Sequence, residues 1–303
     1  MMAKWLLAGI LFATTLSQPV LAEPRQTLGW GRIFDNDALG DQKDRWQTGS
    51  YTVSMVRGPS WSGVLPSQFG EILEFRLSVK TIAPSNLASP DHKDRRYAGT
   101  LSFGLTTHMD WRGFETSLGA ELDVTGPQTG IGGFQTWIHD IMGLAKPNLS
   151  NQIGNAVYPT LLAEVGRSFP IGSNVTLRPF MAAQAGVETY VRAGGDLVIG
   201  SFGKGALMLR DGTTGQRYRA VNGDHIPAMS FTLGGDVAKV FDSAYLPSGG
   251  AAVASDTRTR IRAGVQWQGE RASAFYGITY LSPEFDSQSQ GQLVGSLNLN
   301  LRF

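Results

Sequence analysis

The last eleven residues of the chain, Leu293-Val294-Gly295-Ser296-Leu297-Asn298-Leu299-Asn300-Leu301-Arg302-Phe303, decide the fold. Leu, Gly or Phe fills every second position, and Val, Ser, Asn or Arg stands between them. A period of two places these two sets on opposite faces of a β-strand. One apolar face and one largely polar face are expected of a strand that meets lipid outside and a polar interior inside. The segment therefore predicts a strand of a membrane-spanning β-barrel.

The same alternation elsewhere brings the predicted number of strands to twelve. Between Arg260 and Trp267, apolar residues alternate with residues that include two Arg, which suits a polar lumen on one side and an aromatic residue near the lipid interface on the other. An even number of antiparallel strands is expected of a single-chain bacterial barrel. The predicted strands are residues 29–36, 48–57, 70–80, 97–108, 112–124, 157–169, 174–187, 189–202, 227–239, 258–268, 271–282 and 292–303.

The segments between these strands favour a membrane barrel over a soluble one. Turn signals at 112–113, 171–174 and 268–270 are tight. Other connections are long and polar, namely 58–69, 81–96, 125–156, 203–226 and 240–257. Short turns on one side and long loops on the other are typical of outer-membrane barrels. A periplasmic β-sandwich or lipocalin-like barrel would also alternate, but most strands of globular sheets have only about five or six residues.

The N-terminal region predicts export from the cytoplasm. Lys4 precedes an apolar run over 5–16 and then Pro19-Val20-Leu21-Ala22, as in a signal peptide spanning 1–22. No later run approaches the roughly 20 apolar residues of a membrane helix. The terminal Phe303 on an alternating strand resembles the C-terminal signal of bacterial outer-membrane proteins. We therefore expect a single barrel domain over 23–303, located in the bacterial cell outer membrane.

The composition excludes several classes of function. A formal net charge of +1 gives no electrostatic basis for binding nucleic acid. With no Cys, the chain has no disulfide framework. It also lacks a Gly-x-Ser-x-Gly elbow, a phosphate-binding loop and a His-Glu-x-x-His pair. These absences argue against an α/β-type serine hydrolase, an NTPase and a zinc protease.

One segment breaks the strand rhythm. Residues 134–144 carry apolar side chains at helical spacing and end near Gly143, which predicts a short helix in a loop. Gln135 and His139 are four residues apart and so lie on one face of that helix. A His held beside an amide fits a general base that the amide orients. A structural or solvent-facing His fits the same pattern.

Carboxylate and amide oxygens gather at the end of the first predicted strand. Asp35, Asn36 and Asp37 follow one another there. Such oxygens can coordinate a hard cation such as Ca²⁺, although the same triplet is also ordinary turn chemistry. The spacing is not that of an EF-hand loop.

Taken in order, six motifs resemble the outer-membrane lipid A 3′-O-deacylases. The resemblance implies a twelve-stranded barrel with a short helix in one extracellular loop, a Ca²⁺ requirement and lipid A of the outer-leaflet lipopolysaccharide as substrate. The motifs are Asn36-Asp37, Asp44-Arg45-Trp46-Gln47-Thr48-Gly49, Asp94-Arg95-Arg96-Tyr97-Ala98-Gly99, Gly126-Pro127, Gln135-Thr136-Trp137-Ile138-His139 with Gly143, and Tyr280-Leu281-Ser282-Pro283-Glu284-Phe285.

The resemblance also implies roles for single residues. His139 would activate water for attack on the ester, with Gln135, Thr48 and Asn36 as further catalytic residues, while Asp37 would hold the Ca²⁺ near the developing oxyanion. The nearby basic residues Lys93, Arg95 and Arg96 are candidates for binding the lipid A phosphates. Arg95 fits equally well as an ion-paired residue of the barrel wall. We expect a monomer whose partners are outer-membrane lipids.

Two other functions stay open at this point. A barrel of the same family could use these loops only for structure or lipid packing. An outer-membrane phospholipase would instead use a Ser nucleophile near a His, and Ser50 and Ser54 are the candidates.

Overall fold

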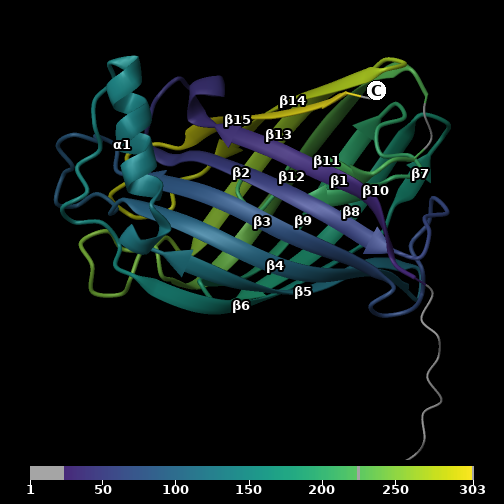
Figure 1. Ribbon diagram of the computed structural model, residues 1–303, viewed down its shortest axis with the longest axis horizontal. Helices are drawn as coiled ribbons and strands as arrows, with labels where there is room; N and C mark the ends of the chain where they lie inside the picture. Colours follow the sequence, from purple (N-terminus) through teal and green to yellow (C-terminus); the bar gives the residue numbers. More distant parts are fainter. Residues whose placement is uncertain (1–23, 224–225, 302–303) are drawn as a thin grey trace, which may run out of the picture.

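The computed structural model describes residues 24–223 and 226–301, which form an antiparallel β-barrel with a helix at one end (Figure 1). Every one of the twelve predicted strands corresponds to a strand of the wall. The predicted signal peptide and Phe303 lie outside the described residues. The wall consists of β1 (Gln26–Asn36), β2 (Trp46–Gly58), β3 (Ile72–Ala83), β4 (Ala98–Trp111), β5 (Phe114–Thr125), β6 (Ala156–Gly166), β8 (Val175–Ala185), β9 (Glu188–Ile199), β12 (Ala228–Ser243), β13 (Thr257–Gln268), β14 (Ala272–Leu281) and β15 (Gln292–Leu301).

The sheet closes on itself because its first and last strands pair. Phe34 on β1 lies opposite Leu297 on β15, and β6 pairs with β8 around the rest of the wall. A short strand, β7 (Phe169–Ile171), extends the edge of β6 along β8. A closed antiparallel sheet is the β-structure that can span lipid, since it pairs its backbone groups between strands.

The two faces of the wall differ as the alternation predicted. On β13, Ile261 and Trp267 are exposed on the outer face, while Arg260 and Arg262 are buried inside. The predicted turn at Arg112-Gly113 has positive φ at both residues, 57° and 83°, as a two-residue type I′ hairpin requires. The outer face is therefore an apolar surface suited to hydrocarbon.

The prediction that all long connections lie on one side was wrong. In an antiparallel barrel, successive connections alternate between the two ends whatever their length. The long connections from β2 to β3 and from β9 to β12 therefore start at the end opposite the helix. Conversely, the end that carries the helix includes the short connection at 186–187, between β8 and β9.

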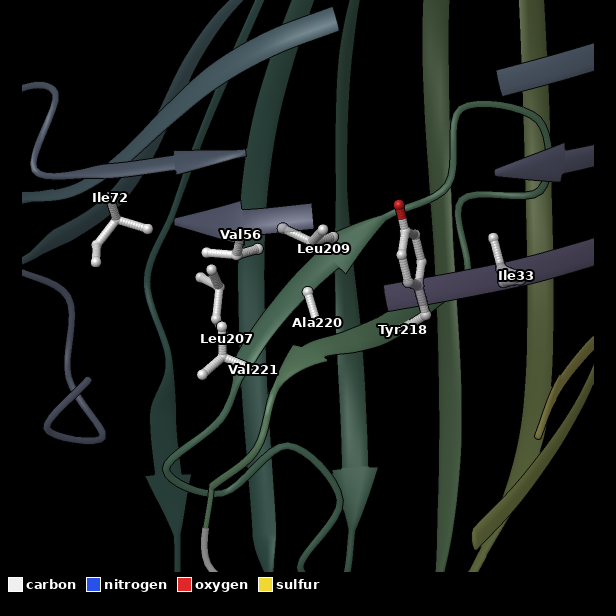
Figure 2. Packing of buried hydrophobic residues seen from close by; sticks show 8 residues of the cluster. All are labelled: Ile33, Val56, Ile72, Leu207, Leu209, Tyr218, Ala220 and Val221. Atoms are coloured by element: carbon white, nitrogen blue, oxygen red, sulfur yellow. The ribbon is translucent and has the colours of Figure 1, made fainter. Parts of the chain in front are cut away.

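The connection between β9 and β12 folds back into the lumen as a hairpin, β10 (Leu207–Arg210) and β11 (Arg217–Val221). Tyr218 Oη lies 3.0 Å from Ser54 Oγ on β2, and Arg210 Nε donates to Glu164 Oε2 on β6 at 2.7 Å, so the hairpin spans from one wall to another. It packs in the apolar cluster of Figure 2, formed by Ile33, Val56, Ile72, Leu207, Leu209, Tyr218, Ala220 and Val221.

Ion pairs line much of the rest of the lumen, around a cavity of about 730 Å³. Three Arg side chains surround the buried carboxylate of Asp236, those of Arg192, Arg260 and Arg262. Arg262 also bonds Asp196, which receives a second Arg from the hairpin, Arg210. The buried charges of Asp196 and Asp236 are thus compensated by Arg side chains within the barrel.

The helix α1 (Ile131–Met142) follows β5 through the short η2 (Pro127–Thr129). It begins three residues before the predicted start and ends before Gly143, which has a positive φ of 66° as a helix C-cap. Gly132 lies within the helix at a point of close packing, where a Cβ would come within 2.9 Å of Leu149 Cδ1. Among the described residues, no helix is both long and apolar enough to cross a membrane.

Candidate active site

The helix α1 rests with its first turn on the outer surface of the barrel wall, at one end of the barrel (Figure 1). Ile131 packs against Gly99 of β4, where a Cβ would lie 2.7 Å from Ile131 Cβ. Gly99 alternates with Leu101 and Phe103, and Phe103 is exposed on the outer face. The space between the helix and the wall is therefore outside the lumen.

Thr48 reaches this space because of a β-bulge. Gln47 lies opposite Ile82 and Gly49 lies opposite Thr81, which leaves Thr48 as an extra residue of β2. Bulges re-aim side chains and are common beside active sites. Thr48 is 6% exposed, and its side chain faces the carboxylate of Asp44. Its hydroxyl donates to that carboxylate, which leaves the lone pairs of Oγ1 free to accept.

Asn36 ends β1 next to that bulge. It pairs with Gly49, where a Cβ would lie 3.1 Å from Asn36 Nδ2. Its Oδ1 accepts a hydrogen bond from Ala38 N at 2.8 Å and so caps the short η1 (Asp37–Leu39). The amide nitrogen of Asn36 therefore lies beside the backbone that carries Thr48.

Asp37 is buried one residue further along, in η1. Its Oδ2 accepts a hydrogen bond from Arg45 N at 2.8 Å and a longer one from Gln292 Nε2 at 3.4 Å. Burial raises the pKa of Asp37 to about 8, because the loss of water outweighs the hydrogen bond from Arg45. Through Arg45 N the carboxyl group fixes the connection that leads from η1 to β2.

His139 lies on the side of α1 that faces the wall, together with Gln135 as their spacing predicted. The imidazole is buried, and Nδ1 lies 2.6 Å from Ala145 O, to which it donates. Nε2 faces Asp44 Oδ2 at 3.1 Å and Gln135 Nε2 at 3.4 Å. One nitrogen is thus fixed by the backbone and the other faces the space between helix and wall.

Sequence reasoning missed Asp44 as a site residue. Gln135 Nε2 lies 3.5 Å from Asp44 Oδ1, so this carboxylate contacts both polar side chains of the helix. Burial raises the pKa of Asp44, and the neighbouring imidazole of His139 opposes the shift. The available signal was its position, four residues before Thr48 in one quoted motif. We call Asn36, Asp44, Thr48, Gln135 and His139 the rim site.

The phenol of Tyr97 is a second group that the sequence did not single out. Tyr97 is buried beside Gly132 of α1, and its Oη accepts a hydrogen bond from the Thr81 hydroxyl. Burial and the carboxylate of Asp44 both raise its pKa, so the hydroxyl keeps its proton. The phenol therefore still has its own proton to donate at the edge of the rim site.

The three basic candidates for phosphate binding lie in different settings. Arg95 is buried and forms an ion pair with Glu284, which also accepts hydrogen bonds from Gln47 Nε2 at 3.0 and 3.1 Å. The ion pair of the alternative that the sequence left open is therefore present, but Arg95 lies in the connection from β3 to β4 and not in a strand of the wall. Lys93 and Arg96 are exposed in the connection from β3 to β4, at the end of the barrel that carries α1.

The two candidate Ser nucleophiles face the lumen. Ser50 Oγ donates to Asp35 Oδ2 at 2.8 Å, and Ser54 Oγ donates to Glu74 Oε1 at 2.6 Å. His108 bonds the other oxygen of Glu74 at 2.9 Å, so a carboxylate separates Ser54 from the imidazole. In a nucleophilic Ser–His pair the imidazole contacts the hydroxyl directly. Neither contact pattern suits a Ser nucleophile.

The rim site offers donors that fit Ca²⁺, a hard cation that takes oxygen ligands. Gln135 Oε1 is a buried oxygen without a hydrogen-bond partner in the described part of the chain, and Thr48 Oγ1 keeps free lone pairs. Both side chains lie against the Asp44 carboxylate. Buried unpaired oxygens are costly unless a ligand satisfies them. Over residues 24–223 and 226–301, no three His, Cys, Asp or Glu side chains gather as a metal cluster. Neutral oxygens would therefore supply most of the protein ligands.

Comparison with solved structures finds the same barrel. LpxR from Salmonella typhimurium matches with a TM-score of 0.74 at 16% identity, over 91% of this chain and 100% of that chain. The β-domain of the Bordetella autotransporter BrkA matches more weakly, with a TM-score of 0.43 at 11% identity over 91% of this chain and 99% of that chain. At such identities the first match shows the fold, a twelve-stranded antiparallel barrel.

Sequence comparison gives the family. No curated protein matches the chain. The family model described as "Outer membrane protein LpxR" matches residues 6–303. This match spans nearly the whole chain, and it agrees with the barrel, the short helix and the outer-membrane location expected from the sequence. The chain belongs to the LpxR family of bacterial outer-membrane proteins.

Proposed function

We propose that this protein is a calcium-dependent lipid A 3′-O-deacylase, which hydrolyses the ester bond of the 3′-linked acyloxyacyl chain. Membership of the LpxR family supports lipid A as the substrate class. The observation that carries the chemistry is the setting of His139, with Nδ1 on Ala145 O and Nε2 in the space between α1 and the wall. A buried His that donates from one nitrogen and keeps the other beside polar side chains is arranged as a general base.

The reaction uses water as the nucleophile. Water gives a proton to Nε2 of His139 while its oxygen attacks the carbonyl carbon of the ester. The carbon–oxygen bond to the sugar then breaks, and the proton passes from His139 to the departing 3′ oxygen. The products are a free acyloxyacyl fatty acid and lipid A with a 3′-hydroxyl group. A positioned base of this kind contributes about 10²–10⁴-fold to the rate.

The other rim-site residues position the reactants. Gln135 Nε2 lies within 3.5 Å of both His139 and Asp44, so it holds the imidazole side of the site in place. Asn36 offers its amide beside the Thr48 bulge, where it can meet the ester oxygen. The protonated Tyr97 lies at the same edge.

When bound, Ca²⁺ would polarise the ester carbonyl and offset the charge that develops on its oxygen. We assign its protein donors to Thr48, Gln135 and Asp44, next to the Asp37 that the sequence singled out. Asp37 acts on this group through Arg45 N, which directly follows Asp44 in the chain. A single carboxylate among neutral oxygens corresponds to a weak site, of the class that extracellular Ca²⁺ modules show, with dissociation constants of about 10⁻⁴–10⁻³ M.

For the phosphates of lipid A we propose Lys93 and Arg96, which are exposed at the same end of the barrel. The Arg95 side chain is committed to Glu284 and plays no part in this proposal. A monomer suffices for the reaction, since every proposed group comes from one chain.

Mass spectrometry of lipid A tests the proposal directly. Membranes from cells that make the protein are incubated with Ca²⁺ or with a chelator, and the loss of the acyloxyacyl mass is measured. We expect the loss with Ca²⁺ only, and we expect its absence with His139→Ala. His92→Ala, which changes an exposed loop His, is the matched control and should keep the activity. Undiminished product with His139→Ala would falsify the mechanism.

The same samples separate the two rival functions. An outer-membrane phospholipase requires that glycerophospholipids are cleaved and that lipid A is not. A barrel without catalytic activity requires unchanged lipids in every condition, together with no effect of Ca²⁺ on thermal stability.

A further inference from the structure

The helix α1 has an apolar face that the barrel leaves uncovered. Phe134, Trp137 and Ile141 are 61%, 56% and 66% exposed and lie three or four residues apart, so they form one stripe along the helix. The rings of Phe134 and Trp137 pack together with their centroids 5.8 Å apart. Gln135 and His139 lie on another side of the same helix, toward the wall.

Large aromatic and aliphatic side chains in a row are unusual on a surface that meets water. Single exposed apolar residues are ordinary, whereas a contiguous patch marks a binding surface. The polar pair of Asp140 and Lys146 borders the stripe and is itself exposed. An apolar stripe with a charged border is the pattern of a helix that lies in a membrane interface.

The stripe is continuous with the lipid-facing surface of the barrel. α1 starts on the outer face of β4, where Ile131 covers Gly99, and not over the lumen. The strands around it carry exposed apolar side chains on that outer face, Phe103 on β4, Leu122 on β5 and Val157 on β6. A helix that continues an apolar wall outward with a further apolar face meets the same hydrocarbon.

We propose that the exposed face of α1, formed by Phe134, Trp137 and Ile141, is a docking surface for the acyl chains of outer-leaflet lipid. The occupant is hydrocarbon because no charged side chain lies within the stripe and because the surface beside it already faces lipid. With this face among acyl chains, His139 on the wall side lies where an ester between chain and headgroup would be presented. This inference rests on the outer-membrane location of the protein and does not depend on the proposed esterase activity.

Site-directed spin labelling measures directly whether the exposed face of α1 lies in hydrocarbon or in water. The method suits this protein because the natural chain has no Cys. A nitroxide is attached at Trp137→Cys, with Leu122→Cys on the wall and Asp140→Cys on the helix border as controls. The protein is reconstituted in bilayers that contain lipopolysaccharide. Collision rates with oxygen, which enters hydrocarbon, and with a water-soluble nickel chelate are then compared.

We expect the oxygen-to-nickel ratio at position 137 to match that at 122 and to exceed that at 140 by several-fold. A ratio at 137 equal to that at 140 places the stripe in water and overturns the proposal. Spin–spin broadening at 137 that vanishes on dilution with unlabelled protein would mean that a second copy covers the face, which also overturns it. Ile141→Cys is the second reporter if Trp137→Cys does not fold. Because no turnover is needed, a failed esterase assay leaves the outcome unaffected.

Discussion

The lumen and the rim site are both rich in buried polar groups, but they satisfy them differently. In the lumen, Asp236 has three Arg partners and Asp196 has two, so each negative charge is matched within the protein. In the rim site, Asp44 contacts the imidazole of His139 and the amide of Gln135, and Gln135 Oε1 has no hydrogen-bond partner among the described residues. These two lumen carboxylates each meet several Arg side chains, whereas the Asp44 carboxylate of the rim site forms no ion pair with an Arg or a Lys among the described residues.

This difference separates a structural network from a site that takes a ligand. Buried ion pairs hold strands in register, and breaking one leaves an uncompensated charge. A buried oxygen without a partner instead lowers stability, and such oxygens are retained where a ligand, an ion or a substrate binds to them. Changes in the lumen should therefore alter stability more than activity, and changes in the rim site should do the reverse.

The largest expected effect is at the base. His139→Ala removes the proton acceptor, and we expect the rate of lipid A deacylation to fall about 10²–10⁴-fold with little change in the unfolding midpoint. Initial rates from lipid A mass spectrometry and urea unfolding of the same preparations provide the two readouts. A loss of stability as large as the loss of activity would contradict the separation between the two regions.

The matching change in the lumen is Asp236→Asn, which leaves three Arg side chains without their shared charge. We expect the free energy of unfolding to fall by about 3–5 kcal/mol, as for a broken buried pair. The rate of deacylation should stay near that of the natural chain at temperatures where the barrel remains folded. A parallel drop in rate under those conditions would mean that the lumen takes part in catalysis.

A smaller effect is expected at the bulge. Thr48→Val keeps the shape of the side chain and removes Oγ1, which lies against the Asp44 carboxylate. We expect the Ca²⁺ concentration for half-maximal activity to rise about tenfold, which corresponds to about 1.4 kcal/mol. Terbium luminescence, read as ion binding without substrate, checks whether the shift lies in binding. Thr52→Val, a substitution of a buried lumen Thr on the same strand, is the control and should leave terbium binding unchanged.

The sequence predicted the barrel well because alternation is a local signal repeated in every strand. Ile261 and Trp267 point outward and Arg262 inward as the period of two requires. The hairpin β10–β11 was missed because its apolar residues, Leu207 and Leu209, have partners on β1 to β3 that only the closed barrel brings near. Its short strands look like a loop when read without those partners.

The rim site was partly predictable for a similar reason. Gln135 and His139 share a helix face by spacing alone, but Asp44 joins them only because α1 folds back over the wall. Arg95 is the converse case. Its positive charge suggested that it binds a phosphate of lipid A, but in the fold its side chain forms an ion pair with Glu284. Neither contact can be read from local sequence, because each joins segments far apart in the chain.

The smallest effect on activity is expected at Ser50, which tests the boundary between the two regions. Ser50 and Thr48 are two residues apart on β2, yet the Ser50 hydroxyl donates to Asp35 inside the lumen while Thr48 faces Asp44 outside. Ser50→Ala removes one of several hydrogen bonds to Asp35, so the free energy of unfolding should fall by about 0.5–1.5 kcal/mol. The deacylation rate should not change, because water and not Ser50 attacks the ester. If the deacylation rate of Ser50→Ala fell to that of His139→Ala, Ser50 would be the nucleophile. The reaction would then take place in the lumen, among its paired charges, and not at the rim site.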